Sequence, residues 1–440
     1  MTRGTTTGRS LEQFRKLSAL HLTYLKYIGL WAEFDSNSSR FLRYLYHVYN
    51  KFILAVILVF MVTLFADICL SFDDLSIVTD DGCIFAGIVV VFFKVMIFQT
   101  RREQIVRLLH ETIDGCNRLC KFPIGDEGEI VDKYLLISRV TFYGFSTLAF
   151  FLVISLLFVV PVEDGELPIR ARYPFNTTVY PWHGIGFFVE ACTVSVGLTA
   201  IIGIDSLLTN LCNLFLVQLE ILNTHFKNCG NDRQHDATPN GIDKRDNSGT
   251  TSRNVCYEVS LTFEANCGKD NYVPDAIRRG DFSVRFGRSI RNHQRLLAVI
   301  CDFNKIFSAG MFVQIVSSTS MICLTGFQAV LVIGQNSNIL KFMVYLMAAL
   351  SQLFYFCWIG NEVLYQSALL TQNQWLSKWD EELSAKTGRL LILSLIFSKK
   401  AVKLKAGVFF ALSMETYTSI LKGSYSFFAL LSTMHLEDDQ

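Results

Sequence analysis

The chain alternates long apolar runs with shorter polar segments along its whole length. A helix that crosses the hydrocarbon core of a bilayer needs about 20 predominantly apolar residues. Seven runs approach or exceed this length, at 52–70, 83–98, 140–160, 185–204, 306–333, 339–359 and 406–434. The pattern therefore predicts an all-α integral membrane protein with seven transmembrane helices.

Several apolar patterns continue beyond the predicted spans. Segments 205–222, 291–305 and 361–379 keep apolar residues at spacings of three and four, which is the period of an amphipathic helix. A further apolar run at 391–398 is too short to cross a membrane, and lysines follow it directly. We expect these segments to form an intracellular helical anchor layer beside the spans.

The connecting segments differ sharply in positive charge. Those on one predicted side contain 33 lysines and arginines, whereas those on the other side contain two, Arg170 and Arg172. Because positive residues resist translocation, the N-terminus is predicted to be cytosolic and the C-terminus extracellular. Of two glycosylation sequons, Asn176 lies on the predicted outer side and is the expected sugar acceptor, whereas Asn37 lies on the cytosolic side.

These signals divide the chain into seven parts. The polar insertion at 226–280, which is rich in Asn, Asp, Gly and Arg, gives no indication of function. The parts are a cytosolic N-terminal arm (1–51), spans one to four with their loops (52–204), cytosolic helix extensions with a long polar loop (205–305), spans five and six (306–359), cytosolic anchor helices (360–405), the last span (406–434) and an extracellular tail (435–440).

Composition supports a lipid environment and argues against several other partners. Hydrophobic residues make up 51% of the chain and the mean hydropathy is +0.34, while the net charge of +1 offers no basic excess for nucleic acid. The 12 cysteines are scattered and are expected to pack as small hydrophobes. Cys116 and Cys120 lack the second ligand pair of a zinc site. No catalytic sequence motif occurs, so we predict neither an enzyme nor a cofactor.

The last predicted span is unusual because charged and hydroxyl side chains occur well inside it. Glu415, Ser419, Lys422 and Ser426 follow one another at spacings of four, three and four, which places them on one face of a helix. An unpaired charge at the bilayer centre costs at least about 2.5–3.5 kcal/mol, so this face predicts a water-filled path. The alternative is that these groups bond to neighbouring helices, and the pattern leaves both open.

Four other charged residues lie near the ends of predicted spans: Lys94, Glu190, Lys305 and Lys341. A long side chain near a span end can bury its methylene groups while its charged end reaches water. We therefore expect these four to extend to the membrane surface.

A small-molecule pocket within the spans would have apolar and aromatic walls with a few polar groups. The outer halves of the spans supply candidates, namely Val91, Phe150, Phe151, Ile154, Phe187, Phe188, Cys192, Ser195, Phe342 and Tyr345. Aromatic residues in transmembrane helices also serve as packing and interfacial residues. No spacing within this set singles out a site.

An ordered set of short motifs occupies the last hundred residues. Phe356-Cys357-Trp358-Ile359-Gly360-Asn361-Glu362 is followed by Ser367, Trp375, Lys405-Ala406-Gly407, Leu412-Ser413, Thr416-Tyr417 and Leu421-Lys422-Gly423-Ser424-Tyr425-Ser426-Phe427. In this order and spacing the motifs resemble those of the insect odorant receptor family. The closing segment 424–427 looks like that of a tuning subunit and unlike that of the co-receptor.

The resemblance implies an odorant-gated, non-selective cation channel in the plasma membrane of olfactory sensory neurons. In that family a tuning subunit assembles with the shared odorant receptor co-receptor, as a tetramer joined by intracellular helices. The resemblance also implies that a volatile apolar odorant binds between spans two, three, four and six, and that the last span lines the pore. Phe428 and Leu431 would then form an apolar constriction near the outer end of that span.

Three other classes of membrane protein fit the sequence less well. A seven-helix G-protein-coupled receptor would have an external N-terminus and Asp-Arg-Tyr and Asn-Pro-x-x-Tyr motifs, which are absent. A gustatory-type ligand-gated channel shares the topology, but its closing Thr-Tyr and Gln-Phe pattern is not met. A transporter would carry inverted repeats with broken helices in both halves, and the sequence shows no such repeats.

Overall fold

The computed structural model describes residues 2–31, 39–72, 75–121, 127–154, 167, 169, 171–175, 179–230, 282–331, 339–382 and 384–438. Within these residues the chain is almost entirely helical, as predicted. The helices are α1 (Thr2–Tyr27), α2 (Arg40–Leu70), α3 (Leu75–Thr100), α4 (Arg102–Cys120), α5 (Glu127–Ile154), α6 (Trp182–Lys227), α7 (Phe282–Leu331), α8 (Ile339–Trp375), the 3-10 helix η4 (Trp379–Glu382), α9 (Ala385–Ser398) and α10 (Met414–Asp438), with strands β1 (Lys405–Ala406) and β2 (Phe410–Ala411).

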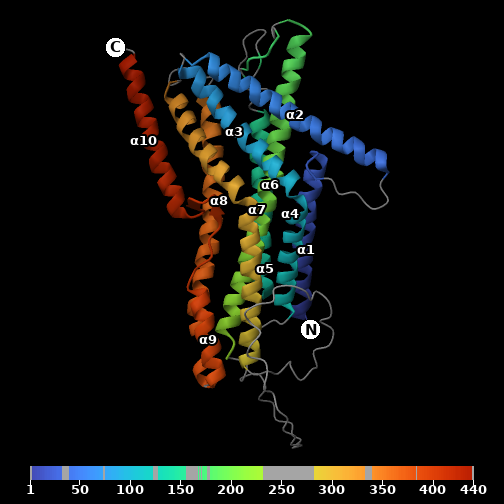
Figure 1. The fold of residues 1–440 in the computed structure, drawn as a ribbon, viewed down its shortest axis with the longest axis vertical. Helices are drawn as coiled ribbons and strands as arrows, with labels where there is room; N and C mark the ends of the chain where they lie inside the picture. The colour runs from blue at the N-terminus through green and yellow to red at the C-terminus, as the bar shows by residue number, and fades with distance from the viewer. Residues whose placement is uncertain are drawn as a thin grey trace, which may run out of the picture.

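The helices form an elongated bundle with two layers along its long axis (Figure 1). In that view α2, α3 and α10 lie in the upper layer, and α1, α4 and α9 lie in the lower one, whereas α6, α7 and α8 pass through both. These three helices have 46, 50 and 37 residues. At about 1.5 Å per residue each is longer than the roughly 30 Å hydrocarbon core of a bilayer. The helical extensions expected beyond the spans are therefore present.

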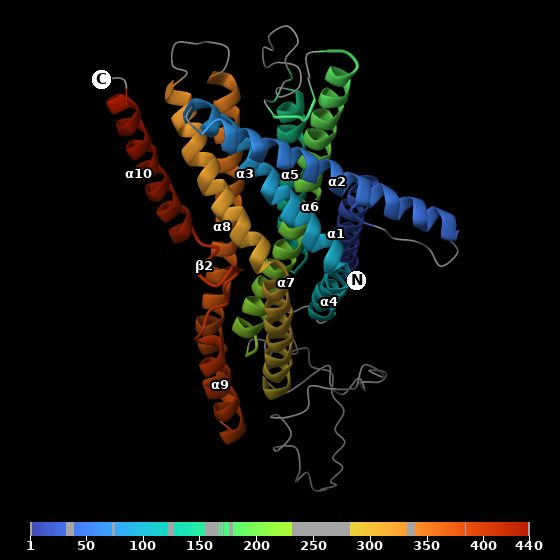
Figure 2. The ribbon, with the colours of Figure 1, turned by 45° about the horizontal axis from the view of Figure 1, so that its top comes forward.

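Six of the described helices are long and apolar enough to cross a membrane. They correspond to the first six predicted spans. The seventh prediction falls on α10, a 25-residue helix that is also long enough to cross. Figure 2 shows α10 along the edge of the bundle, beside α8, with α2 crossing the other helices obliquely.

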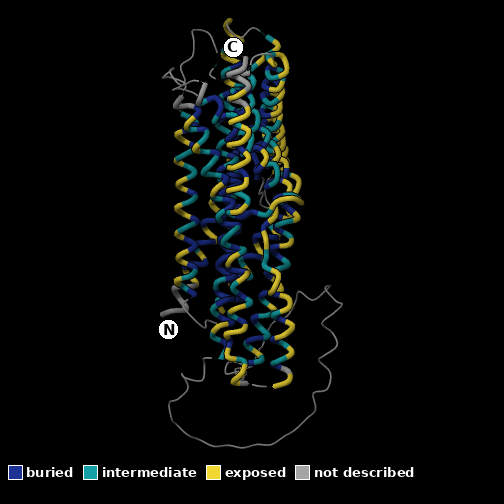
Figure 3. The backbone as a smooth tube through the Cα atoms, turned by 90° about the vertical axis from the view of Figure 1, so that its left-hand side faces the viewer, coloured by how far each residue is buried: buried dark blue, intermediate teal, exposed yellow. Residues whose placement is uncertain are grey.

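The core follows α6, which is buried on every side through the middle of the bundle. Leu207, Leu211 and Phe215 are each 0% exposed, as expected of a helix that is apolar all round. Some of its polar groups bond to neighbouring helices. Asn210, for example, donates to Ser18 of α1 at 2.8 Å. Figure 3 shows buried residues extending along the interior through both layers. The two layers thus share one continuous core.

A short hairpin connects the lower layer to α10. Strands β1 and β2 pair in antiparallel fashion, and Gly407 between them has a φ of 65°, which glycine adopts without strain. The Gly407 amide donates to the Ser308 carbonyl of α7 at 2.7 Å. The last helix consequently begins at Met414, later than the predicted span start at 406, because the apolar segment 406–412 forms this hairpin and its turn.

Candidate functional site

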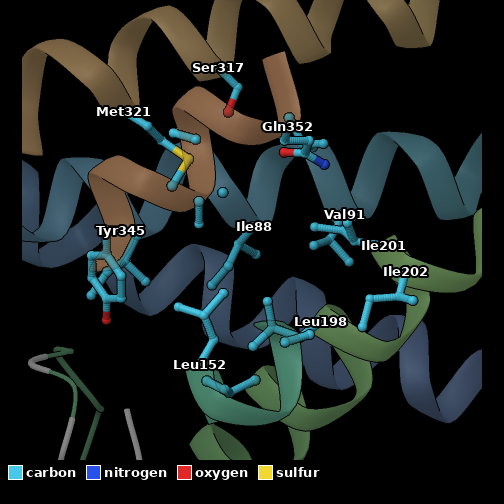
Figure 4. Close-up of a pocket in the computed structure, with 18 of the residues that line it drawn as sticks. Ile88, Val91, Leu152, Leu198, Ile201, Ile202, Ser317, Met321, Tyr345 and Gln352 are labelled. Carbon is cyan, nitrogen blue, oxygen red and sulfur yellow. The ribbon is translucent and has the colours of Figure 1, made fainter. Parts of the chain in front are cut away.

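A cavity of about 190 Å³ lies in the upper layer, between α3, α5, α6, α7 and α8 (Figure 4). Its walls are chiefly aliphatic: Ile88 comes from α3, Leu152 from α5, Leu198 and Ile202 from α6, and Met321 from α7. An apolar cavity of about 150 Å³ already accommodates a molecule the size of benzene. The cavity is therefore large enough for a small organic ligand that is held by apolar contact.

Two glycines keep this space open. A Cβ at Gly197 of α6 would lie 3.7 Å from Val91, and one at Gly87 of α3 would lie 3.9 Å from Met321. Both distances are ordinary van der Waals contacts, so a methyl group fits but a larger side chain would extend into the cavity. The cavity volume thus depends on small residues on two facing helices.

Ile169, which precedes α6 in the chain, forms part of the cavity wall and is 1% exposed. Its backbone N–H donates to Glu190 Oε2 of α6 at 3.1 Å. Glu190 itself is 0% exposed. The expectation that Glu190 reaches the membrane surface is therefore wrong, because its carboxylate is buried and accepts a hydrogen bond from the backbone of the cavity-lining residue Ile169.

The opposite end of the cavity is polar. Asp205 lines it and forms an ion pair with Lys94 of α3, with Nζ and Oδ1 2.5 Å apart. Both side chains are nearly inaccessible, at 4% and 6% exposure. The expectation that Lys94 reaches the surface is wrong as well, because a carboxylate from another helix neutralises it inside the bundle. Lys305, in contrast, is 70% exposed, and the side chain of Lys341 lies outside the described residues.

The predicted pocket residues are distributed unevenly around this cavity. Val91 and Tyr345 line it. Phe150, Phe151 and Phe188 do not, and they are 63%, 65% and 55% exposed on the outside of the bundle. The remaining candidates are buried or half-buried without lining the cavity, namely Ile154, Phe187, Cys192, Ser195 and Phe342.

Residues that the sequence reasoning missed lie one helix face away. The lining residues of α5 are Phe145, Leu148, Ala149 and Leu152, and those of α6 include Val194, Leu198, Ile201 and Asp205. Both sets follow spacings of three and four, the periodicity of one helix face. The spacing alone could have grouped these residues on one helix face, but it does not indicate which apolar face of a span points inward.

The polar face of α10 points away from the rest of the chain. Glu415, Ser419, Lys422 and Ser426 are all exposed. Among the described residues, neither Glu415 nor Lys422 has an ion-pair partner. The opposite face packs on α7, where Cys323 donates a weak hydrogen bond to the Ser424 carbonyl at 3.7 Å.

The two residues predicted to form a constriction lie further along α10. The Phe428 ring is half-buried, and a Cβ on Gly326 of α7 would lie 3.8 Å from it. The side chain of Leu431 lies outside the described residues, as does Asn176. The constriction and the glycosylation site both stay predictions.

These features define a class of protein. Membrane-spanning helices line a mostly apolar cavity, and a helix at the edge of the bundle presents a polar face. This architecture suits a membrane protein that binds a small molecule. A sequence profile described as 7tm odorant receptor matches residues 74–425, so the chain belongs to the odorant receptor family, as its motifs predicted.

Individual relatives agree with this assignment. Odorant receptor 85c of Drosophila melanogaster is 29% identical over 151 residues, which is 34% of this chain and 38% of the relative. Odorant receptor 85b of the same species is 32% identical over 152 residues, covering 34% and 37%. The aligned part thus spans well under half the length of these curated relatives. The assignment to the family comes from the longer profile match.

The fold also resembles that of a solved receptor. The olfactory receptor OR5 from Machilis hrabei in complex with eugenol superimposes with a TM-score of 0.77, covering 96% of this chain and 99% of that chain at 13% sequence identity. At that identity the likeness concerns the fold alone. It extends over both layers, including the helices that enclose the cavity.

Proposed function

We propose that this chain is an odorant receptor subunit of the tuning type, which opens a non-selective cation channel when a volatile molecule binds. The observation that carries the proposal is the mostly apolar cavity between the helices. Its walls include α7 and α8, the two helices against which α10 packs. A ligand in the cavity therefore contacts the helices that hold α10 in place.

The ligand is a small, largely apolar volatile compound. Burying about 250 Å² of apolar surface at roughly 25 cal/mol per Å² contributes about 6 kcal/mol, which suffices for reversible binding of such a compound after the cost of association. The olfactory receptor OR5 from Machilis hrabei, which has a similar fold, was solved in complex with eugenol. Val91 and Tyr345 are the candidates from the sequence that we assign to the ligand contact.

Conduction follows the polar face of α10, formed by Glu415, Ser419, Lys422 and Ser426. One chain supplies only one wall of such a path, so the channel requires further subunits. We assign these to the odorant receptor co-receptor in a hetero-tetramer, with Phe428 and Leu431 as the apolar constriction. Exposed apolar residues on α9, such as Ile392, Ile396 and Phe397 at 59%, 62% and 67%, support contacts between subunits in the lower layer.

In the cell the lower layer faces the cytosol and the cavity lies toward the outside. The distribution of lysine and arginine supports this orientation. We propose the plasma membrane of olfactory sensory neurons as the location, with glycosylation at Asn176. Glycosidase treatment then shifts the wild-type band on a gel and leaves that of Asn176→Gln unmoved.

Current recording at controlled voltage, with and without the co-receptor, tests the function. We expect odorant-evoked cation currents only when both proteins are present. Gly197→Leu should abolish these currents across an odorant panel, because the added side chain extends into the cavity. Gly144→Leu is the matched control, since Gly144 is exposed on α5 with no atom within 4 Å of its Cβ position.

Surface biotinylation separates loss of binding from loss of folding. If Gly197→Leu reaches the surface and still responds to the whole panel, the cavity is not the binding site. If the wild-type chain, at the surface with the co-receptor, responds to no volatile compound, the receptor function itself is wrong.

A further inference from the structure

The polar end of the cavity is a chain of four side chains from four helices. Lys94 of α3 pairs with Asp205 Oδ1 of α6 at 2.5 Å. Asp205 Oδ2 accepts a hydrogen bond from Gln352 Nε2 of α8 at 2.6 Å. Gln352 Oε1 in turn accepts from Gln314 Nε2 of α7 at 3.1 Å. Three of the four, namely Asp205, Gln314 and Gln352, line the cavity.

The charge of Asp205 sets the direction of every bond in this chain. An ionised carboxylate is an acceptor only, so Gln352 must present its NH₂ group to Asp205. The Gln352 carbonyl then faces Gln314, which must present its own NH₂ group. That same group also donates to Ser318 Oγ at 2.9 Å. Rotating either amide by 180° would bring two acceptors together, so both orientations follow from the ion pair.

This direction leaves one acceptor without a donor. Gln314 is 4% exposed, and its Oε1 atom is buried without a hydrogen-bond partner among the described residues. Buried polar groups in proteins are almost always bonded, and an unsatisfied buried acceptor is unfavourable. A ligand that brings a hydrogen-bond donor to this end of the cavity would remove that defect.

We propose that the cavity selects apolar molecules that carry one neutral hydrogen-bond donor, and specifically a hydroxyl group, which Gln314 Oε1 accepts. This proposal rests on the proposed function, in which the cavity binds the odorant. An ether or ester of the same length has no donor for Gln314. An ionised acid would be repelled by Asp205. The aliphatic walls hold the hydrocarbon part, and the Gln314 carbonyl fixes the orientation of the hydroxyl group.

The test compares n-alkanols from hexanol to decanol with the corresponding alkyl methyl ethers, on the full chain expressed with the co-receptor. We expect the wild type to respond at lower concentration to each alkanol than to the matched ether. Gln314→Met should reduce this preference by about 3- to 10-fold, the contribution of one hydrogen bond to affinity, while ether potency stays within about 2-fold.

Two further variants make the result specific. Gln314→Met frees the Gln352 carbonyl, and removing Gln352 in turn frees Asp205 Oδ2, which also lines the cavity. The quadruple variant Lys94→Met/Asp205→Leu/Gln314→Met/Gln352→Leu removes every acceptor of this chain and should lose the preference fully. Gln328→Met is the matched control, because Gln328 lies on the same helix, is 2% exposed and does not line the cavity. It should retain the wild-type preference for alkanols.

The possible outcomes separate this inference from the proposed function. If the quadruple variant keeps the wild-type ratio of alkanol to ether potency, or if the wild type prefers ethers, the hydroxyl assignment is wrong while the cavity can still be the receptor site. If Gly197→Leu responds normally to both series, the cavity itself is not the site. Loss of the preference in the Gln314 variants, but not in Gln328→Met, supports the proposal.

Discussion

The upper layer contains two pairs of oppositely charged side chains, and the two pairs differ in their surroundings. Lys94 and Asp205 come from different helices and pair at 2.5 Å with almost no exposure. Glu415 and Lys422 lie on one helix and are both exposed. The first pair is neutralised within the chain. The second pair needs water or another subunit, since lipid does not solvate charge.

The difference teaches that the position of a charge within a span does not reveal its role. Lys94 lies near a predicted span end and is nevertheless buried, whereas the charges deep inside the last span face outward. What decides is whether a neighbouring helix offers a counter-ion. The predictions below test this distinction, beginning with the largest expected effect on stability.

Removing the counter-ion of Lys94 should have the largest effect. Asp205→Asn leaves the buried Lys94 ammonium group without a charged partner. Removing one partner of a buried ion pair lowers the free energy of unfolding by about 3–5 kcal/mol. We expect strongly reduced surface expression and a lower melting temperature in detergent. Surface biotinylation and thermal unfolding measure the two effects.

A second ion pair provides the control. Lys133 and Glu220 lie 3.0 Å apart in the lower layer, with the Lys133 side chain 51% exposed, so Glu220→Gln should cost about 0–1 kcal/mol. The double variant Lys94→Met/Asp205→Leu removes both buried charges and should recover much of the stability lost in Asp205→Asn. Equal stability of Asp205→Asn and Glu220→Gln would show that the buried pair is unimportant for folding.

Much of the fold could be read from the sequence. Six apolar runs and their helical extensions correspond to described helices, because length and a three-to-four spacing are local properties. The start of α10 could not be read in this way, since residues 406–412 are as apolar as a span. There the positive φ of Gly407 and its bond to Ser308 produce a hairpin instead. Both depend on contacts with a distant part of the chain.

The site was less accessible to sequence reasoning. Val91 and Tyr345 line the cavity, but Phe150 and Phe188 point outward, because a span that is apolar on several faces does not reveal its rotation about its own axis. Asp205 directly follows a predicted span and falls in the predicted cytosolic extension. Its partner Lys94 is 111 positions away in the sequence. No local pattern connects the two residues.

Among the predicted pore residues whose side chains the structure describes, Phe428 is half-buried whereas the others are exposed, so its replacement should have an intermediate effect. Phe428→Ala removes a half-buried ring beside α7 and should cost about 1–2 kcal/mol, less than truncation of a fully buried Phe. If the ring also forms an apolar constriction, basal current without ligand should rise, because a wider gate dewets less easily. Reduced surface expression with unchanged basal current per channel would identify the ring as a packing contact only.

His21 of α1 is a buried ionisable side chain for which the bundle offers no counter-ion. The ring is 1% exposed and lies against Phe142, with centroids 4.8 Å apart, and burial lowers the pKa of His21 to about 4 from the ordinary value of 6.5. The imidazole therefore stays neutral in the fold but is protonated in the unfolded chain once the pH falls below about 6.5. Its stabilising contribution is complete above that pH and is lost progressively down to about pH 4.

We expect the detergent-solubilised protein to lose about 1 kcal/mol through His21 between pH 7.4 and pH 5.5. His21→Phe should reduce the pH dependence of thermal unfolding by that amount. His47→Phe, which replaces an exposed histidine of α2, is the control. Identical pH profiles for the wild type and His21→Phe would show that acid acts elsewhere.

The smallest effect on stability, and the clearest effect on conduction, should come from the polar face of α10. Glu415 is exposed and has no ion-pair partner among the described residues, so Glu415→Gln should change the free energy of unfolding by less than about 0.5 kcal/mol. If this face borders the conduction path, the variant removes a negative charge from it and should alter cation permeability or block by divalent ions. The order of potency across an odorant panel should stay the same, because the cavity is formed by other helices.

Lys422→Met removes the opposite charge from the same face and should shift permeability in the opposite direction. If both variants reach the surface with wild-type conductance, permeability and block, the polar face contacts another subunit or lipid headgroups, and the pore lies elsewhere.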